Sequence, residues 1–248
     1  MIPFGLEQHI LDVCQNVYLF GSRVYGTNTD DSDYDYVIVL KEGVTIGVDK
    51  PLAKINIGNY HYQVYSDAEF TYKIINHDIM ALECIFNSSN NMWKSENELI
   101  KHFILNKNKL RESISTISSN SYVKAKKKLI ISGDYDKKAG MKSIFHSLRI
   151  LDYGIQIATY DKIVSYSNSN WIWCEIVELG KQYDTDILWE KLDARYRKLY
   201  NSLKTEFKIL APKDLEIRDV ERNLDTILKK YNCYSFELKQ EIEELYSK

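Results

Sequence analysis

The feature that most constrains this chain is a Gly-Ser turn followed closely by two alternating aspartates. Gly21 and Ser22 end a short apolar run, and Asp33 and Asp35 stand at the entrance to an apolar run over 36–40. Residues two apart on a strand point to the same face, so the two carboxylates can bind one or two hard cations. Backbone N–H groups and a hydroxyl at a tight turn can bind phosphate oxygens. Together these groups predict a site for a metal-bound nucleoside triphosphate.

The chain spells Gly-Ser-Arg-x-x-Gly-Thr from Gly21 and Ser-Asp-x-Asp up to Asp35. This spelling resembles the nucleotidyltransferase fold of the DNA polymerase β superfamily, in particular its minimal and RNA-repair-associated bacterial and phage branch. Either half alone would be a weak signal, whereas both at this spacing argue against an ordinary acidic turn. The resemblance implies that Asp33 and Asp35 are catalytic and ligate Mg²⁺ or Mn²⁺. It also implies nucleotide contacts from Gly21, Ser22 and Arg23.

A second pattern lies in the helix predicted over 137–158. Lys142, His146 and Arg149 recur at i, i+4 and i+7, which places them on one helix face. Three groups that are or can become cationic would be satisfied by a triphosphate opposite them; a solvated polar face is the alternative. The resembling branch carries a Lys-x-x-x-His-x-x-Arg helix after its catalytic domain. The resemblance, which covers roughly residues 15–165, therefore implies that all three residues bind the nucleotide.

The third carboxylate of the family is missing from its usual strand. Polymerase β-type transferases take it from the strand after the Asp-x-Asp strand, here predicted over 60–65, which contains no acid. His61 stands at the expected position and is our candidate catalytic residue. Histidine can act as a general base near neutral pH, but it binds magnesium less well than a carboxylate does. Either His61 takes the base role, or an acid arrives from elsewhere, or catalysis is weak or absent.

Glu83 resembles a recurring family glutamate that could contact the acceptor, with a helix-surface or helix-capping glutamate as the alternative reading. The one dense basic run, over 124–128, could contact a nucleic-acid backbone, although a solvated helix face accounts for it as well. Trp171 and Trp173 could stack on a base, and core packing is the alternative. These signals are weaker than the two motifs, and they extend the predicted site only as candidates.

Composition sets the class of protein. The chain has 248 residues, 44% of them hydrophobic, and a net charge of -2, which gives little electrostatic support to nucleic-acid binding. The four cysteines fit no metal-binding spacing and read as buried free thiols in a reducing cytoplasm. There is no signal-peptide pattern and no apolar run near the roughly 20 residues that a membrane helix needs. We therefore expect a cytoplasmic protein without a membrane partner.

The expected elements define an α+β protein. Strands are predicted over 17–20, 36–40, 54–57 and 60–65. Helices are predicted over 6–14, 70–75, 78–86, 96–106, 110–129, 137–158 and 186–210, and two more within 215–246. The helix over 110–129 has a possible break at 118–121. A polar run closes the first part near residue 91. We expect a small mixed β-sheet nucleotidyltransferase core over 1–91, and a mainly helical domain over 92–248 that completes the nucleotide pocket.

The predicted activity is transfer of a nucleoside monophosphate from an NTP to an acceptor hydroxyl, with release of pyrophosphate. The resemblance favours an RNA end as the acceptor; a protein or a small molecule is the alternative. A different class of function also stays open, a non-catalytic nucleotide-binding sensor or partner module with a degenerate active site. The missing third acid supports that second reading, whereas the intact Gly-Ser, Asp-x-Asp and Lys/His/Arg set supports the enzyme.

Overall fold

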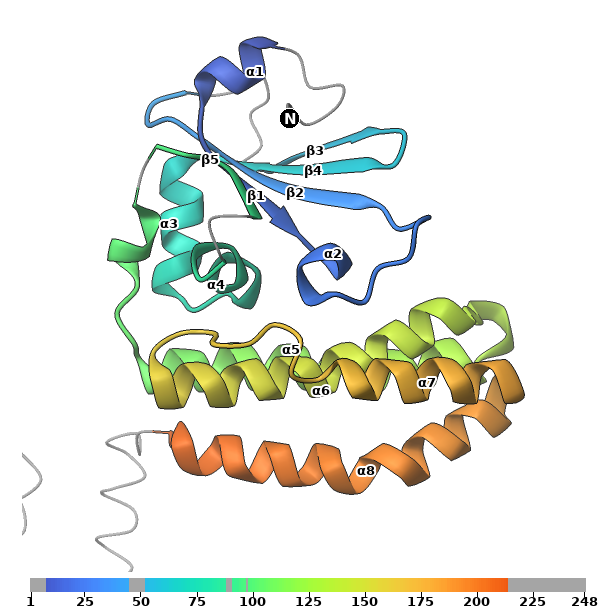
Figure 1. Ribbon diagram of the computed structural model, residues 1–248. Helices are drawn as coiled ribbons and strands as arrows, with labels where there is room; N and C mark the ends of the chain where they lie inside the picture. The colour runs from blue at the N-terminus through green and yellow to red at the C-terminus, as the bar shows by residue number, and fades with distance from the viewer. Residues whose placement is uncertain (1–7, 45–51, 88–90, 97, 214–248) are drawn as a thin grey trace, which may run out of the picture. The chain divides into compact units, whose positions relative to one another are not determined.

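A mixed sheet of five strands carries both the Gly-Ser turn and the two aspartates (Figure 1). The computed structural model describes residues 8–44, 52–87, 91–96 and 98–213. The strands are β1 (Cys14–Phe20), β2 (Tyr34–Leu40), β3 (Leu52–Ile57), β4 (Tyr60–Tyr65) and β5 (Met92–Ser95). Their order in the sheet is β3-β4-β2-β1-β5, in which β2 and β4 run parallel and the other neighbours run antiparallel.

Helices follow and flank the sheet, so the predicted α+β class is confirmed. They are α1 (Gln8–Val13), α2 (Ser22–Tyr25), α3 (Asp67–Ile75), α4 (Ile79–Ile85), α5 (Lys107–Ile130), α6 (Lys137–Tyr160), α7 (Asn170–Gln182) and α8 (Thr185–Leu210), with short 3-10 helices at Leu99–His102 and Ser132–Asp134. Helix α6 packs against α5, α7 and α8. The sheet and the helices up to residue 212 belong to one compact unit.

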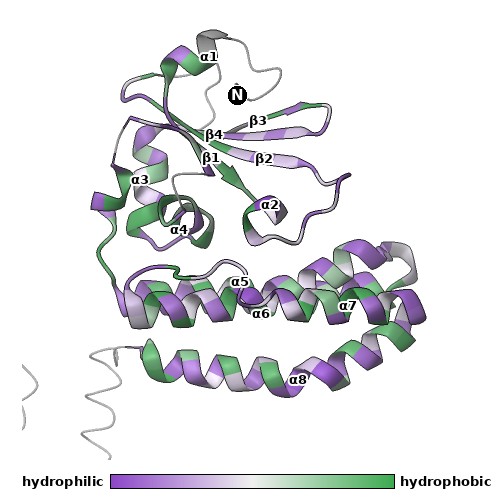
Figure 2. Ribbon diagram, viewed as in Figure 1, coloured by the Kyte–Doolittle hydropathy of each residue, from purple (hydrophilic) through white to green (hydrophobic). Residues whose placement is uncertain are grey.

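Strand β2 lies in the middle of the sheet because its side chains find apolar partners on both faces. Val37 and Val39 belong to the large core, which also contains residues of α3 to α8. Ile38 and Leu40 point to the opposite face and pack in a smaller cluster with Leu11 of α1. Figure 2 shows the matching pattern in the helical part, where hydrophobic and hydrophilic residues alternate along α8. Because both faces of β2 are buried, the position of this strand, and with it that of Asp35, is fixed.

Local signals set most of the boundaries. The Ser66 hydroxyl accepts a hydrogen bond from the Glu69 N–H and caps α3, and the Asp78 carboxylate caps α4. Gly58, with φ of +57°, turns the chain between β3 and β4, as the predicted hairpin requires. The long helix predicted over 137–158 is observed as α6.

Two expectations in the middle of the chain are wrong. Residues 96–106 do not form one helix, because β5 pairs with the edge of β1 just beyond residue 91 and only a short 3-10 helix follows. Helix α5 is continuous through 118–121, because Ser118 is buried and its hydroxyl donates to the Ser147 carbonyl at 2.8 Å. Helix α7 is not among the predicted elements. The helices predicted over 215–246 lie outside the described residues.

The cysteine expectation is corrected at one position. Cys14 and Cys84 are free and buried, whereas Cys174 on α7 is free and exposed. Cys233 lies outside the described residues. Among the residues that the structure describes, no helix is both long and apolar enough to cross a membrane.

Candidate functional site

The Gly-Ser turn packs directly against Asp35. Strand β1 ends at Phe20, which is the register partner of Asp35 in β2, and α2 begins at Ser22. Gly21 between them has φ of +80°, a conformation that side chains disfavour. A Cβ atom at Gly21 would lie 2.5 Å from Asp35 Oδ2. Glycine is therefore required here both by the backbone angle and by the close approach of the carboxylate.

Asp35 has a second neighbour on its other side. The parallel register pairs Asp35 with His61 in β4, and His61 Nδ1 lies 3.4 Å from Asp35 Oδ1. Burial raises the pKa of Asp35; the nearby charge of Asp33 adds to this shift, while His61 and Lys142 oppose it. Asp33 itself is exposed just before β2. The structure thus brings the two aspartates and His61 together at one end of the sheet.

Arg23 holds the segment that leads to these aspartates. Its guanidinium donates to the backbone carbonyl of Ser32 at 2.6 Å and to that of Asp33 at 3.2 Å. The same group stacks over the Tyr34 ring at 3.6 Å. Arg23, which the sequence assigned to the nucleotide, is therefore engaged with the backbone and an aromatic ring of its own chain.

A cleft of about 510 Å³ is lined by residues from the sheet side and by residues of helix α6. Ser22 and Asp35 line it from the sheet side, and Lys142 and His146 line it from α6. Members of both sequence motifs thus face a common space, although more than 100 residues separate them; Gly21, Asp33 and Arg149 are not among the residues that line it. Lys142 is exposed, and its charge reaches Asp35, whose pKa it lowers.

The cleft contains two lysines that sequence reasoning did not place there. Lys124 of α5 and Lys138 of α6 both line it. Lys138 stands one turn before Lys142, a spacing that could have been read from the sequence. Lys124 belongs to the basic run over 124–128, and only the packing of α5 against α6 brings it to the cleft. With Lys142, these residues make the lining strongly cationic, which suits a polyphosphate.

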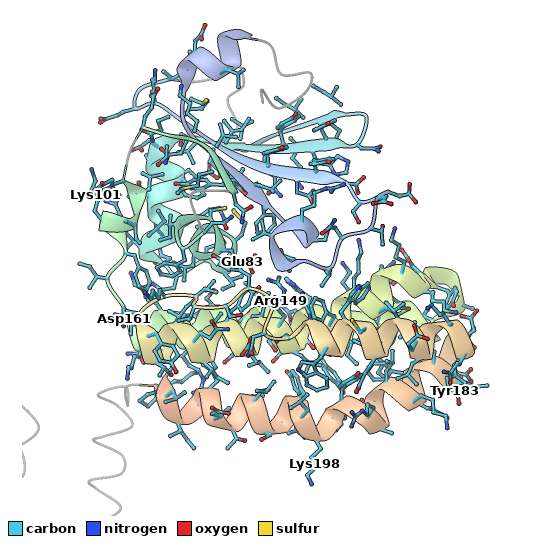
Figure 3. The ribbon with its side chains drawn as sticks, in the orientation of Figure 1. Glu83, Lys101, Arg149, Asp161, Tyr183 and Lys198 are labelled. Carbon is cyan, nitrogen blue, oxygen red and sulfur yellow. The ribbon has the colours of Figure 1, made fainter. Side chains whose placement is uncertain are left out.

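Arg149 and Glu83 lie beneath this lining rather than in it. Arg149 is 0% exposed, and its Nη1 donates to Glu83 Oε1 at 2.9 Å (Figure 3). Its Nη2 donates to His146 Nδ1 at 2.8 Å, and its guanidinium stacks over the Tyr25 ring at 3.6 Å. Glu83 is 2% exposed, so the residue that the sequence suggested for the acceptor is buried in an ion pair.

The paired aspartates fit a magnesium or manganese ion. Within the described ranges, no group of three or more His, Cys, Asp or Glu side chains could hold a metal by itself. Magnesium in phosphoryl-transfer sites is commonly held by one or two carboxylates together with substrate phosphates and water. The charge of Asp33 contributes to the raised pKa of Asp35, and a cation held by both carboxylates would offset this repulsion.

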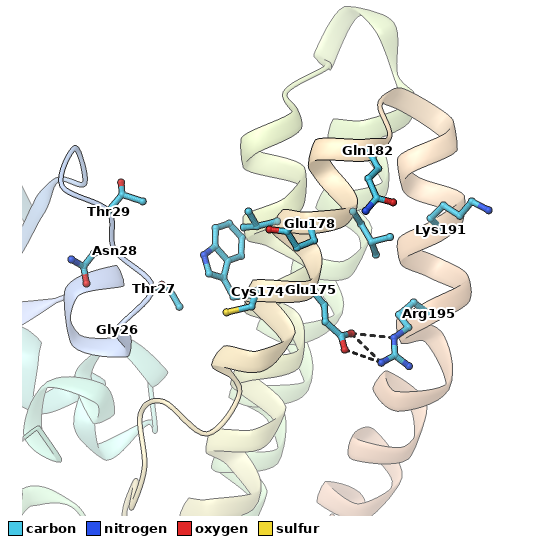
Figure 4. A pocket seen from close by; sticks show the side chains of 13 residues that line it. Gly26, Thr27, Asn28, Thr29, Cys174, Glu175, Glu178, Gln182, Lys191 and Arg195 are labelled. Atoms are coloured by element: carbon cyan, nitrogen blue, oxygen red, sulfur yellow. Dashed lines mark hydrogen bonds and ion pairs between the residues drawn. The ribbon is translucent and has the colours of Figure 1, made fainter.

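A second cavity of about 800 Å³ lies next to the cleft (Figure 4). It is bounded by residues 26–29 and by α7 and α8, and it shares Thr27, Thr29 and Trp173 with the cleft. Two of its charges neutralise each other, because Arg195 donates to both carboxylate oxygens of Glu175 at 3.0 and 3.1 Å. Trp173 also packs at 5.5 Å from the Phe145 ring and thus stands between the two spaces.

Comparison with known proteins finds a similarity in the first part of the chain. Residues 6–106 match the family model of the nucleotidyltransferase domain, in agreement with the resemblance that the motifs carry. Domains of this family transfer nucleotidyl groups in general. A solved nucleotidyltransferase-like protein from Exiguobacterium sibiricum is similar at 12% identity and a TM-score of 0.30, over 94% of this chain and 77% of that chain. No curated protein matches the chain.

Proposed function

We propose that the protein transfers a nucleoside monophosphate from an NTP to an acceptor hydroxyl and releases pyrophosphate. One observation carries the proposal: Ser22 and Asp35 of the sheet share a cleft with Lys142 and His146 of α6. Carboxylates for a metal and cations for a polyphosphate are the two requirements of metal-nucleotide binding. In this proposal residues 1–91 form the catalytic domain, and the helical residues after 91 complete the pocket.

The residues of the two motifs and the lysines of the cleft each have a role in the proposal. Gly21 and Ser22 position the β- and γ-phosphates, and Lys142 neutralises their charge together with Lys124 and Lys138. Asp33 and Asp35 would hold Mg²⁺ or Mn²⁺, which would neutralise charge at the triphosphate and activate the attacking hydroxyl. Arg23 acts indirectly, because it fixes the segment that presents Asp33.

His61 takes the place of the third carboxylate. Its register position beside Asp35 and the 3.4 Å separation of their side chains support this assignment. We propose that His61 accepts the proton of the attacking hydroxyl, while the Asp35 carboxylate next to Nδ1 orients the ring.

The proposed acceptor is an RNA end. Its electrostatic support is local: Lys126 and Lys127 are exposed on α5 close to Lys124, which lines the cleft. A protein hydroxyl or a small molecule is the alternative acceptor. The branch resemblance, rather than the charge of the whole chain, makes RNA the first choice.

One observation favours a second function, a nucleotide-binding sensor or partner module without turnover. Strand β4 (Tyr60–Tyr65) supplies no carboxylate, so the site lacks the third acid that transfer normally uses. A sensor needs only the nucleotide-binding half of the site.

The deciding experiment incubates the protein with Mg²⁺ or Mn²⁺, each α-labelled NTP in turn, and RNA, protein or aminoglycoside acceptors. Incorporation of label that is lost in Asp33→Ala and in Asp35→Ala supports the transferase. Tight NTP binding without incorporation into any acceptor would instead establish the sensor.

The His61→Asp variant tests the third position separately. If His61 replaces the family acid, the variant keeps or gains transfer, because a carboxylate at this position can also accept the proton of the attacking hydroxyl. His61→Ala serves as the control. Wild-type activity in His61→Ala would show that the base lies elsewhere.

A further inference from the structure

A chain of three side chains connects the interior of the nucleotidyltransferase domain to the cleft. Glu83 of α4 accepts from Arg149 Nη1 at 2.9 Å, and Arg149 Nη2 donates to His146 Nδ1 at 2.8 Å. Glu83 and Arg149 are 66 residues apart in sequence, whereas Arg149 and His146 share one face of α6. Only the last member, His146, lines the cleft. The first two do not line the cleft themselves; they reach it through His146, which Arg149 contacts by a hydrogen bond, and through the Tyr25 ring, on which the guanidinium stacks.

Arg149 has little freedom to move. Its side chain is 1% exposed, and its guanidinium lies 3.6 Å from the Tyr25 ring centre and 4.7 Å from that of Tyr153. Burial lowers the pKa of Arg149, but the charge of Glu83 raises it, and the net shift is upward. Arg149 therefore remains a cation. A confined cation with fixed donors presents Nη2 to His146 at a defined position.

This contact determines where the His146 proton resides. All guanidinium nitrogens are donors, so a nitrogen that lies 2.8 Å from one of them must accept. Nδ1 of His146 is therefore unprotonated, and the ring carries its proton on Nε2. Burial, with the charges of Arg149 and Lys124, lowers the pKa of His146 to about 3, so the ring is neutral at physiological pH.

The remaining nitrogen of His146 is available to the cleft. Among the described residues, Nε2 of His146 has no hydrogen-bond partner, and the residue is only partly buried. The Nε2–H group is thus a donor without an acceptor in a space that also contains Lys142 and Ser22. A neutral donor adds a directed hydrogen bond there without a further positive charge.

The ion pair behind His146 is arranged for geometry more than for stability. Arg149 Nε and Glu83 Oε2 have no partner among the described residues, although both atoms are buried. Buried pairs recover their desolvation cost only when their remaining polar atoms are satisfied. The pair therefore contributes mainly by fixing the groups that it touches, and two of these, His146 and Tyr25, line the cleft.

We propose that Glu83 and Arg149 are positioning residues that hold His146 as the neutral Nε2–H tautomer, which donates to a phosphate oxygen of the bound NTP. The phosphate contact rests on the proposed function, whereas the tautomer does not. Loss of either positioning residue releases the ring, and nucleotide affinity then falls although neither residue touches the nucleotide.

The first test reads the tautomer directly. Long-range ¹H–¹⁵N correlation spectra of the full ¹⁵N-labelled chain distinguish a protonated ring nitrogen from an unprotonated one, and the missing signals in His146→Gln assign the ring. We expect Nε2–H with unprotonated Nδ1 at pH 7 without nucleotide. A ring protonated on Nδ1, or doubly protonated, overturns the proposal, and the tautomer itself is read from the wild-type chain.

The second test removes the ion pair without leaving an unpaired charge. In the double variant Glu83→Met/Arg149→Met, the His146 ring should populate both tautomers and titrate closer to its ordinary range. Affinity for ATP, GTP, CTP and UTP with Mg²⁺, measured by calorimetry, should fall about tenfold for the nucleotide that binds. The same double change in a His146→Gln background should cause no further loss.

The failure of the proposed function can be distinguished from the failure of the positioning role. A wild-type chain that shows the Nε2–H tautomer but binds no NTP refutes the nucleotide site and leaves the positioning of His146 intact. A double variant that keeps the wild-type tautomer and the wild-type affinity refutes the positioning role even when transfer activity is demonstrated.

Discussion

Removal of the Glu83 carboxylate should be among the most destabilising single changes in this protein. Glu83 and Arg149 have side chains that are 2% and 1% exposed, and their Oε1 and Nη1 atoms are 2.9 Å apart. Glu83→Ala leaves the guanidinium buried between Tyr25 and Tyr153 without a counter-charge. Arg149 cannot relieve this by deprotonation, because arginine stays charged in proteins.

The size of the effect follows from two opposing terms. At an effective dielectric constant of about 20, unit charges at this separation attract by about 6 kcal/mol. Desolvation of the two ions costs several kcal/mol each, so the intact pair is close to neutral overall. Loss of one partner removes the attraction and leaves the cost for Arg149, and we expect a loss of about 3–5 kcal/mol in the free energy of unfolding. The melting temperature should fall by about 10 °C.

Urea unfolding monitored by tryptophan fluorescence and circular dichroism measures this difference. Glu178→Ala is the control, because Glu178 forms an ion pair with Lys181 at 2.6 Å in which the side chains are 62% and 65% exposed. An exposed pair contributes about 0–1 kcal/mol, so the control should remain near wild type. The double variant Glu83→Met/Arg149→Met should recover most of the stability. A loss below about 1 kcal/mol in Glu83→Ala would contradict the argument, since a buried unpaired charge cannot cost so little.

Three further predictions concern the cleft. Gly21→Ala places a Cβ atom 2.5 Å from a carboxylate oxygen at a φ of +80°, so the free energy of unfolding in urea should fall by about 1–3 kcal/mol and transfer should be abolished. In the control Gly58→Ala, at a φ of +57° in open space, the free energy of unfolding should fall by about 1 kcal/mol and activity should be kept. Lys142→Met should raise the dissociation constant for NTP about tenfold in calorimetry, since it removes a charge from the lining, while Lys198→Met on the exposed side of α8 should not change it. Because the pKa of His146 is about 3 in the folded protein and about 6.5 when unfolded, acid favours the unfolded state. The contribution of the neutral His146 ring to stability is complete above pH 6.5 and falls as the pH drops toward 3. Between pH 7 and pH 5, the free energy of unfolding of the wild type should fall by about 2 kcal/mol more than that of His146→Gln. Equal losses in urea titrations would refute this.

Several parts of the site could be predicted from the sequence because they depend on short-range spacing. The turn at Gly21, the alternation of Asp33 and Asp35, and the helical face shared by Lys142 and His146 each follow from the period of one element. The hairpin around Gly58 and the capping of α3 by Ser66 are equally local. The register of His61 beside Asp35 followed from the family resemblance.

Only the tertiary structure decided which of these elements meet. The sequence could not assign β5 to the free edge of β1, nor bring Lys124 of α5 into the cleft, because both depend on packing between distant segments. It grouped Arg149 with Lys142 and His146, since all three share a face at helical spacing. The structure separates them: Arg149 reaches Glu83, 66 residues away, and contacts the cleft only indirectly, through His146 and Tyr25. Spacing along a helix determines which side chains point the same way, whereas burial against another element decides which of them reach solvent and a ligand.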